Sequence, residues 1–130
     1  MNNEEIIEQY CNFEISKKLR EKGFNISCTT GYNGDGDFIY DDTYHNWNDE
    51  GNYYTAPTHQ MAKEWLRKNY EIFVEIRVIE HQTVFMSGNY YYFRVYKDRK
   101  HVSHIVPNKY YVGPNEAEEA GLLFALENLI

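Results

Sequence analysis

Tyr53-Tyr54-Thr55-Ala56-Pro57-Thr58 and Tyr110-Tyr111-Val112-Gly113-Pro114-Asn115 repeat one pattern, a tyrosine pair followed by proline and a small polar residue. In each copy the proline ends an extended aromatic run. Thr58 and Asn115 can each cap a helix, because their side-chain oxygens accept hydrogen bonds from free backbone N–H groups of the first turn. The two copies therefore predict two helices, over residues 58–69 and 116–129.

Between these helices the sequence indicates three antiparallel strands. Residues 72–79 alternate, with Ile72, Val74, Ile76 and Val78 on one face and Glu75 and Arg77 on the other. Turn residues near 87–89 and 97–100 then separate two further strands, residues 90–96 and 101–106. Such short links join antiparallel neighbours, so we expect a three-stranded meander.

The two helices differ in how much of their surface is apolar. In residues 58–69 the spacing places Trp65 and Leu66 on the core side. Residues 116–129 are apolar around most of the circumference. A helix of that composition has to be covered, either by its own sheet or by another subunit.

The first 56 residues are less regular. Residues 4–22 have an apolar stripe near helical spacing, and Gly23 follows it as a stop signal. Glycine, Asn and Asp interrupt residues 25–55, for which we expect short strands, long loops and a tight turn at 49–52. The prediction is one α+β domain, residues 1–130, with an N-terminal helix and irregular aromatic segment (1–56) and an α-β-β-β-α unit (57–130).

Charge is unevenly distributed along the chain. The net charge of −7 argues against a general affinity for phosphate backbones. Residues 33–52 hold six acids and no Lys or Arg, whereas residues 63–109 hold nine bases against five acids. Cys11 and Cys28 form no disulfide framework, and neither a signal peptide nor a membrane-spanning run is recognisable. We therefore expect a cytoplasmic protein with reduced thiols and no membrane partner.

Two patterns resemble metal sites only in part. Asn33-Gly34-Asp35-Gly36-Asp37 imitates the start of an EF-hand loop, but Phe38 stands where glycine is needed and Tyr44 where the closing Glu should be. His101 and His104 are three residues apart, which on a strand places them on opposite faces. The sequence shows no nucleophile motif either. We predict no catalytic residues, no metal and no cofactor.

The tyrosines offer a more specific signal. The chain has 13 of them in 130 residues. Tyr90, Tyr92 and Tyr96 share a strand face with Arg94, and Arg77 of the preceding strand can join them. Tyrosine with arginine is typical of recognition surfaces, although cross-strand aromatic pairs also stabilise solvated sheets. These five residues form the candidate interaction surface.

Residues 58–130 resemble the double-stranded-RNA-binding domain in their order of elements. The final helix matches that family in its small-and-leucine spacing: Ala117, Ala120, Gly121, Ala125, Leu126 and Leu129. The family binds phosphates from lysines at the start of this helix, where this chain has Asn115, Glu116, Glu118 and Glu119. The resemblance implies the fold, but carboxylates there would repel RNA.

A second resemblance covers most of the chain. The stretches 17–24, 56–67 and 118–130 are similar to those of a family of small uncharacterised proteins from phages and mobile elements of gut Bacteroidetes. The similarity implies an origin in a prophage or mobile element and a shared fold. It implies no activity.

Three functions are consistent with these patterns. The first is a non-enzymatic protein-interaction module that forms a homodimer through its last helix or its aromatic sheet. The second is binding of single-stranded nucleic acid, which predicts that Arg77, Arg94, Arg99 and Lys100 converge beside Tyr90 or Tyr92. The third is an acidic mimic of DNA, which needs a continuous stripe of acids from residues 35–50 and 116–127.

Overall fold

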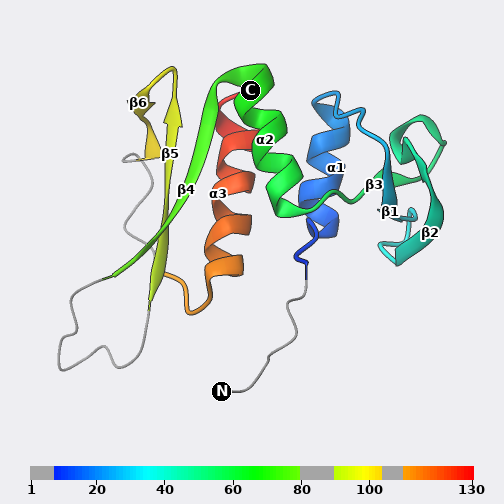
Figure 1. Cartoon of the computed structure of the whole chain (residues 1–130), viewed down its shortest axis with the longest axis horizontal. Helices are drawn as coiled ribbons and strands as arrows, with labels where there is room; N and C mark the ends of the chain where they lie inside the picture. The colour runs from blue at the N-terminus through cyan, green and yellow to red at the C-terminus, as the bar shows by residue number, and fades with distance from the viewer. Residues whose placement is uncertain (1–7, 80–89, 104–109) are drawn as a thin grey trace.

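The α+β class is confirmed by a computed structural model, which describes residues 8–79, 90–103 and 110–130. Within these residues, two antiparallel three-stranded sheets lie at opposite ends, with three α-helices between them (Figure 1). In chain order the elements are α1 (Phe13–Glu21), β1 (Cys28–Tyr32), β2 (Phe38–His45), the 3-10 turn η1 (Trp47–Asp49), β3 (Tyr54–Thr55), α2 (His59–Tyr70), β4 (Ile72–Val78), β5 (Tyr91–Lys97), β6 (Lys100–His101) and α3 (Pro114–Asn128).

The predicted meander is the sheet β4-β5-β6. Strand β4 follows α2 directly, because Glu71 takes a left-handed conformation (φ 52°) and ends the helix. Asp98 and Arg99 also have positive φ values, 51° and 68°, as the favoured two-residue hairpin turn requires. The third strand is shorter than predicted, since β6 ends at His101. The turn at 87–89 and residues 104–106 lie outside the described residues.

Helix α3 is covered by its own chain. It packs against β4 and β5 on one side and against α1 and α2 on others, as Figure 1 shows. Gly121 allows the closest approach, because a Cβ built there would lie 2.7 Å from Cγ1 of Val74. The side chains of Leu122 and Leu126 are fully buried. This central position explains why α3 is apolar on nearly all sides, so the helix needs no second subunit to cover it.

The irregular segment forms the second sheet, in the order β2-β1-β3. The β1–β2 hairpin turns at Asn33, whose side-chain oxygen accepts from the N–H groups of Asp35 and Asp37. Trp47 of η1 lies against Gly31, where a Cβ would come within 2.4 Å of the indole. The expectation of short strands and a turn near residue 51 is confirmed, and Gly51 has a positive φ of 44°.

The N-terminal helix starts later than predicted. Residues 9–11 are extended and pair with residues 57–59, through bonds from Cys11 N to Pro57 O and from His59 N to Gln9 O. Asn12 then caps α1 by accepting from Ile15 N. The helix predicted from residue 4 is therefore wrong for residues 8–12, because this long-range pairing satisfies the backbone of residues 9–11 outside a helix. Residues 4–7 of that prediction lie outside the described residues.

The two copies of the repeated tyrosine–proline pattern differ in how the following helix begins. Thr58 caps α2 as predicted, since its hydroxyl accepts from Met61 N. The predicted cap at Asn115 is wrong: α3 begins at Pro114, Gly113 occupies the cap position, and no side chain caps it. Proline suits the first helical position, because its φ is preset and it has no N–H to leave unpaired. No helix in the described part of the chain is both long and apolar enough to cross a membrane.

Candidate functional site

The outer face of β4-β5 brings together four of the five sequence-predicted surface residues. In the antiparallel register Arg77 lies opposite Tyr92, Glu75 opposite Arg94, and Phe73 opposite Tyr96. Residues directly opposite each other point to the same side of a sheet. These six residues (Phe73, Glu75, Arg77, Tyr92, Arg94 and Tyr96) define what we call the outer face.

The opposite side of the same sheet is packed on helices. Val95 is fully buried, and the Phe93 ring lies 5.9 Å from that of Phe124 in α3. The predicted alternation within β5 is therefore present. In Figure 1 the helices lie on one side of this sheet only, so none of the described helices covers the outer face. The fifth predicted residue, Tyr90, precedes β5, and its carbonyl accepts from Ile79 N.

The outer face mixes exposed aromatic surface with charges that are already paired. Phe73 is 47% exposed. Arg77 donates from Nε to Oε1 of Glu75 over 3.1 Å. Hydrogen bonds to Tyr92 and to Glu75 raise the pKa of Arg77. The face is extended by Tyr110, whose ring stands edge-on to that of Tyr92 at 6.3 Å.

The basic residues expected to converge beside Tyr92 are spread along the sheet. Arg99 and Lys100 belong to the β5–β6 turn and the start of β6, beyond Lys97 at the far end of β5. Lys97 is five positions beyond Tyr92 along the extended strand, a span of roughly 17 Å. Of these four basic residues, all within the described part of the chain, only Arg77 and Arg94 share the outer face with the tyrosines.

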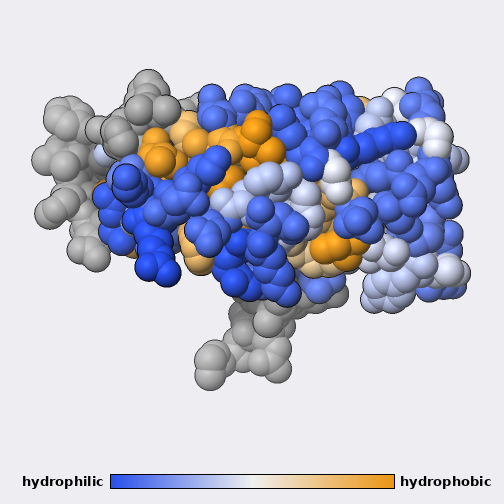
Figure 2. Space-filling view, turned by 90° about the horizontal axis from the view of Figure 1, so that it is seen from above, coloured by the Kyte–Doolittle hydropathy of each residue, from blue (hydrophilic) through white to orange (hydrophobic). Residues whose placement is uncertain are grey.

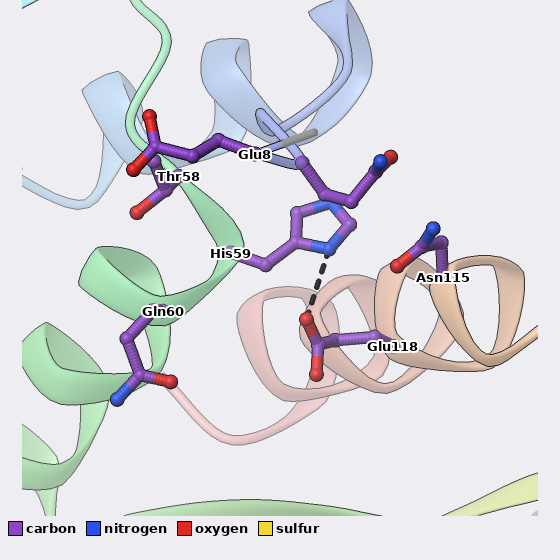
Figure 3. A pocket seen from close by; sticks show the side chains of 7 residues that line it. Glu8, Thr58, His59, Gln60, Asn115 and Glu118 are labelled. Carbon is purple, nitrogen blue, oxygen red and sulfur yellow. Dashed lines mark hydrogen bonds and ion pairs between the residues drawn. The ribbon is translucent and has the colours of Figure 1, made fainter. Parts of the chain in front are cut away.

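Sequence reasoning missed a partly buried cluster where α2 meets α3. The Nδ1 atom of His59 lies 2.9 Å from Oε1 of Glu118 (Figure 3). Lys63 Nζ lies 2.8 Å from Oε2 of the same carboxylate. The Nε2 atom of His59 is 3.6 Å from Oε1 of Glu119, and Oε2 of Glu119 accepts from the side-chain amide of Asn12. The signal available in the sequence was a histidine directly after a helix cap, with two glutamates in a second helix.

Opposing effects act on the Glu118 carboxyl. Burial raises its pKa, but the hydrogen bonds from His59 and Lys63 favour the charged form and leave the pKa below its ordinary value. Glu118 and Glu119 are thus bound to groups of the protein itself. Of the three glutamates that distinguish this helix start from an RNA-binding one, only Glu116 is exposed.

A small pocket opens beside this cluster. Its volume is about 220 Å³, and Thr58, His59 and Glu118 contribute to its wall (Figure 3). Ligand sites are commonly larger, at roughly 300 Å³ or more, and mostly apolar. Cys11 is close enough to Glu118 and Glu119 to be affected by their charges, and burial and these charges raise its pKa strongly. A thiol in that state is a poor nucleophile.

The remaining candidate metal ligands have other roles. Asn33 and Asp37 bind each other and the backbone of the hairpin turn, rather than pointing to a common centre. His101 contacts the Ser103 hydroxyl at 2.7 Å, while His104 is outside the described residues. Within residues 8–79, 90–103 and 110–130, no three His, Cys, Asp or Glu side chains are grouped so that they could hold a metal.

Comparison with known proteins identifies no relative. No family model, curated protein or solved structure matches this chain. The resemblance to proteins of phages and mobile elements therefore stays an expectation from sequence. The functional argument rests on the geometry of the outer face.

Proposed function

We propose that this protein is a non-enzymatic interaction module that binds a second copy of itself through the outer face of β4-β5. The carrying observation is the register of that face, in which Phe73, Glu75 and Arg77 of β4 each lie opposite a chemically complementary residue of β5. The prophage or mobile-element origin and the cytoplasmic location expected from the sequence are part of the same proposal.

Two copies related by a two-fold axis that runs parallel to the strands, above the line between β4 and β5, would bring the opposed residues of one copy into contact with those of the other. This axis places β4 of one copy over β5 of the other, so that Glu75 meets the partner's Arg94 and Phe73 meets the partner's Tyr96. Two sheets packed in this way keep their strands nearly aligned, as sheet sandwiches do. The pairs that stabilise one sheet are then also complementary between two sheets.

The size of the face limits the strength of the dimer. Strands β4 and β5 have 7 residues each, so the face is only about 23 Å long. Stable interfaces bury about 800 Å² on each partner, and a small two-stranded face provides less. We therefore expect a reversible dimer with a dissociation constant roughly in the micromolar range.

The test is light scattering behind a sizing column over a series of protein concentrations. We expect the mass to rise from monomer toward dimer, and Phe73→Asp to abolish the rise by placing a charge in the apolar contact. The control is Ile26→Asp, which adds the same charge at a site of similar exposure (39% against 47%) between α1 and β1.

Two outcomes would contradict this proposal. One is a monomer at every concentration, and the other is equal loss of dimer in both variants. Adding single-stranded DNA or RNA at low salt tests whether the same face binds nucleic acid instead. Co-elution that is reversed by salt and lost in Arg94→Ala would transfer the function to nucleic-acid binding.

A further inference from the structure

We propose that the free edge of β2 binds a lysine- or arginine-rich extended segment of another protein, which adds to the sheet β2-β1-β3 as a fourth strand. This surface is at the opposite end of the molecule from the outer face (Figure 1). The proposal does not depend on dimer formation.

Among the residues that the structure describes, strand β2 is the edge of its sheet and is paired only on its β1 side. Its first residues follow a regular register, with Phe38 opposite Tyr32 and Tyr40 opposite Thr30. The pairing then shifts before His45, which lies opposite Cys28. Such a bulge bends a strand and re-aims its side chains. An extended partner would therefore pair along the regular half, Phe38–Tyr40, and reach the side chains of the bulge beyond it.

The aromatic side chains of β2 are unusually exposed. Tyr40 is 65% and Tyr44 is 73% exposed. The Phe38 ring is 48% exposed and is held at 5.4 Å from the rings of Tyr10 and Tyr32. Tyrosine rings of this kind provide contact area at low entropic cost, and their faces attract the cationic groups of Lys and Arg.

Charge indicates the chemistry of the partner. Residues 33–52 contain six carboxylates and no Lys or Arg. Within the described part of the chain, the ion pairs of these carboxylates are those that His45 makes with Asp41 and Glu50. Asp35 and Asp42 are exposed and have no basic neighbour in ion-pair contact among the described residues. Figure 2 shows hydrophilic residues predominating at this end of the molecule. A cationic segment would supply the missing counter-charge.

The surface is also held in shape before any partner arrives. The amide of Asn48 donates to Phe24 O and accepts from Thr55 N, which ties η1 to both ends of the segment. The Trp47 indole donates to Cys28 O and stacks on the His45 ring at 4.2 Å. A preformed surface loses little conformational freedom on binding, which favours a docking role.

The experiment measures fluorescence anisotropy of two labelled synthetic peptides mixed with the full chain. One peptide alternates lysine with threonine and valine, and the other replaces each threonine and valine by proline. The two peptides have equal charge, but in the second every other residue lacks an N–H and has a φ fixed at about −65°, so this peptide is unsuited to pair as a strand. We expect the first peptide to bind, more weakly as salt rises, and the proline peptide to bind at least about tenfold more weakly.

Matched variants locate the site. Asp35→Asn with Asp42→Asn should weaken binding by about fivefold to tenfold, while Glu21→Gln with Glu116→Gln removes as much charge from exposed helix positions and should change it by less than about twofold. Tyr44→Ser should also weaken binding, unlike Val112→Ser at a site of matching exposure (74%). Phe73→Asp should leave peptide binding intact.

Either of two results would overturn the proposal. Equal binding of both peptides would mean that charge alone attracts them, without strand addition. Equal loss in the Asp35/Asp42 and Glu21/Glu116 variants would mean that the attraction belongs to the whole acidic molecule and not to β2.

Discussion

His59 Nδ1 and Glu118 Oε1, 2.9 Å apart, join the first turn of α2 to α3 across 59 residues of sequence. The histidine side chain is 3% exposed and the glutamate side chain 17%. Lys63 binds the second oxygen of the same carboxylate. One carboxylate therefore satisfies two groups of α2, and its loss would leave a buried imidazole without its acceptor.

The first prediction concerns stability. Glu118→Ala should lower the free energy of unfolding by about 2–4 kcal/mol, because it leaves the buried His59 ring without its acceptor and removes a partly buried charged partner. Glu116→Ala in the same helix, which is exposed, should cost less than about 1 kcal/mol. Urea unfolding followed by tryptophan fluorescence compares the two variants. Equal losses would show that the contact contributes no more than a surface glutamate.

The second prediction concerns acid. The folded-state pKa of Glu118 lies below its ordinary value of 4.5. Its contribution to stability is therefore complete above that value and is lost as the pH falls through the lower folded-state pKa. Between about pH 5 and pH 3 the wild-type protein should lose more stability than Glu118→Gln, which has no carboxyl to protonate. Thermal melts across this range measure the difference, and parallel curves for the two proteins would refute the assignment.

The third prediction concerns Gly121. Alanine there would bring a methyl group within 2.7 Å of Val74 Cγ1 and 3.2 Å of Phe93 Cβ. We expect a net loss of about 1–2 kcal/mol, since overpacking outweighs the gain in helix propensity of about 1 kcal/mol. Val74→Ala makes room for the new methyl group. The double variant should therefore be more stable than the sum of the single effects predicts, which a double-mutant cycle by urea unfolding will measure.

The fourth prediction concerns the two cysteines, which are free and buried, at 0% exposure for Cys11 and 4% for Cys28. Burial raises the pKa of Cys28 to about 11 and that of Cys11 further. Both thiols should resist an aromatic disulfide reagent in the native protein and react fully in urea. The rate of thiol modification in native buffer should be set by how often the structure opens and exposes the cysteines. Rapid labelling of either cysteine in buffer would contradict this burial.

Local signals predicted the α-β-β-β-α half of the fold well. Alternation in residues 72–78 and the cap at Thr58 are properties of neighbouring residues, and both are present in the structure. The second sheet could be anticipated only as short strands, because its pairing joins Gly31 to Thr55 across the intervening hairpin. No local pattern specifies that partner.

Long-range contacts also explain the errors at helix starts. Pro57 stays extended because its carbonyl accepts from Cys11 N. Thr58 is therefore the cap of α2, and the helix begins at His59. Pro114 has no such bond among the described backbone contacts and begins α3 itself. The outer face could be predicted because strand alternation is a local pattern. The contact of His59 with Glu118 could not, because it forms only when α2 packs on α3.

Residues 9–11 pair with residues 57–59, and α1, the β1–β2 hairpin and β3 lie between these two segments in the sequence. A protease that cut the chain at the exposed Gly34, in the hairpin turn, would leave both pieces joined by this pairing and by the buried contacts of α1 with α3. The severed halves would still carry complementary surfaces. The protein is therefore suited to division at that turn into two fragments that reassemble when they meet.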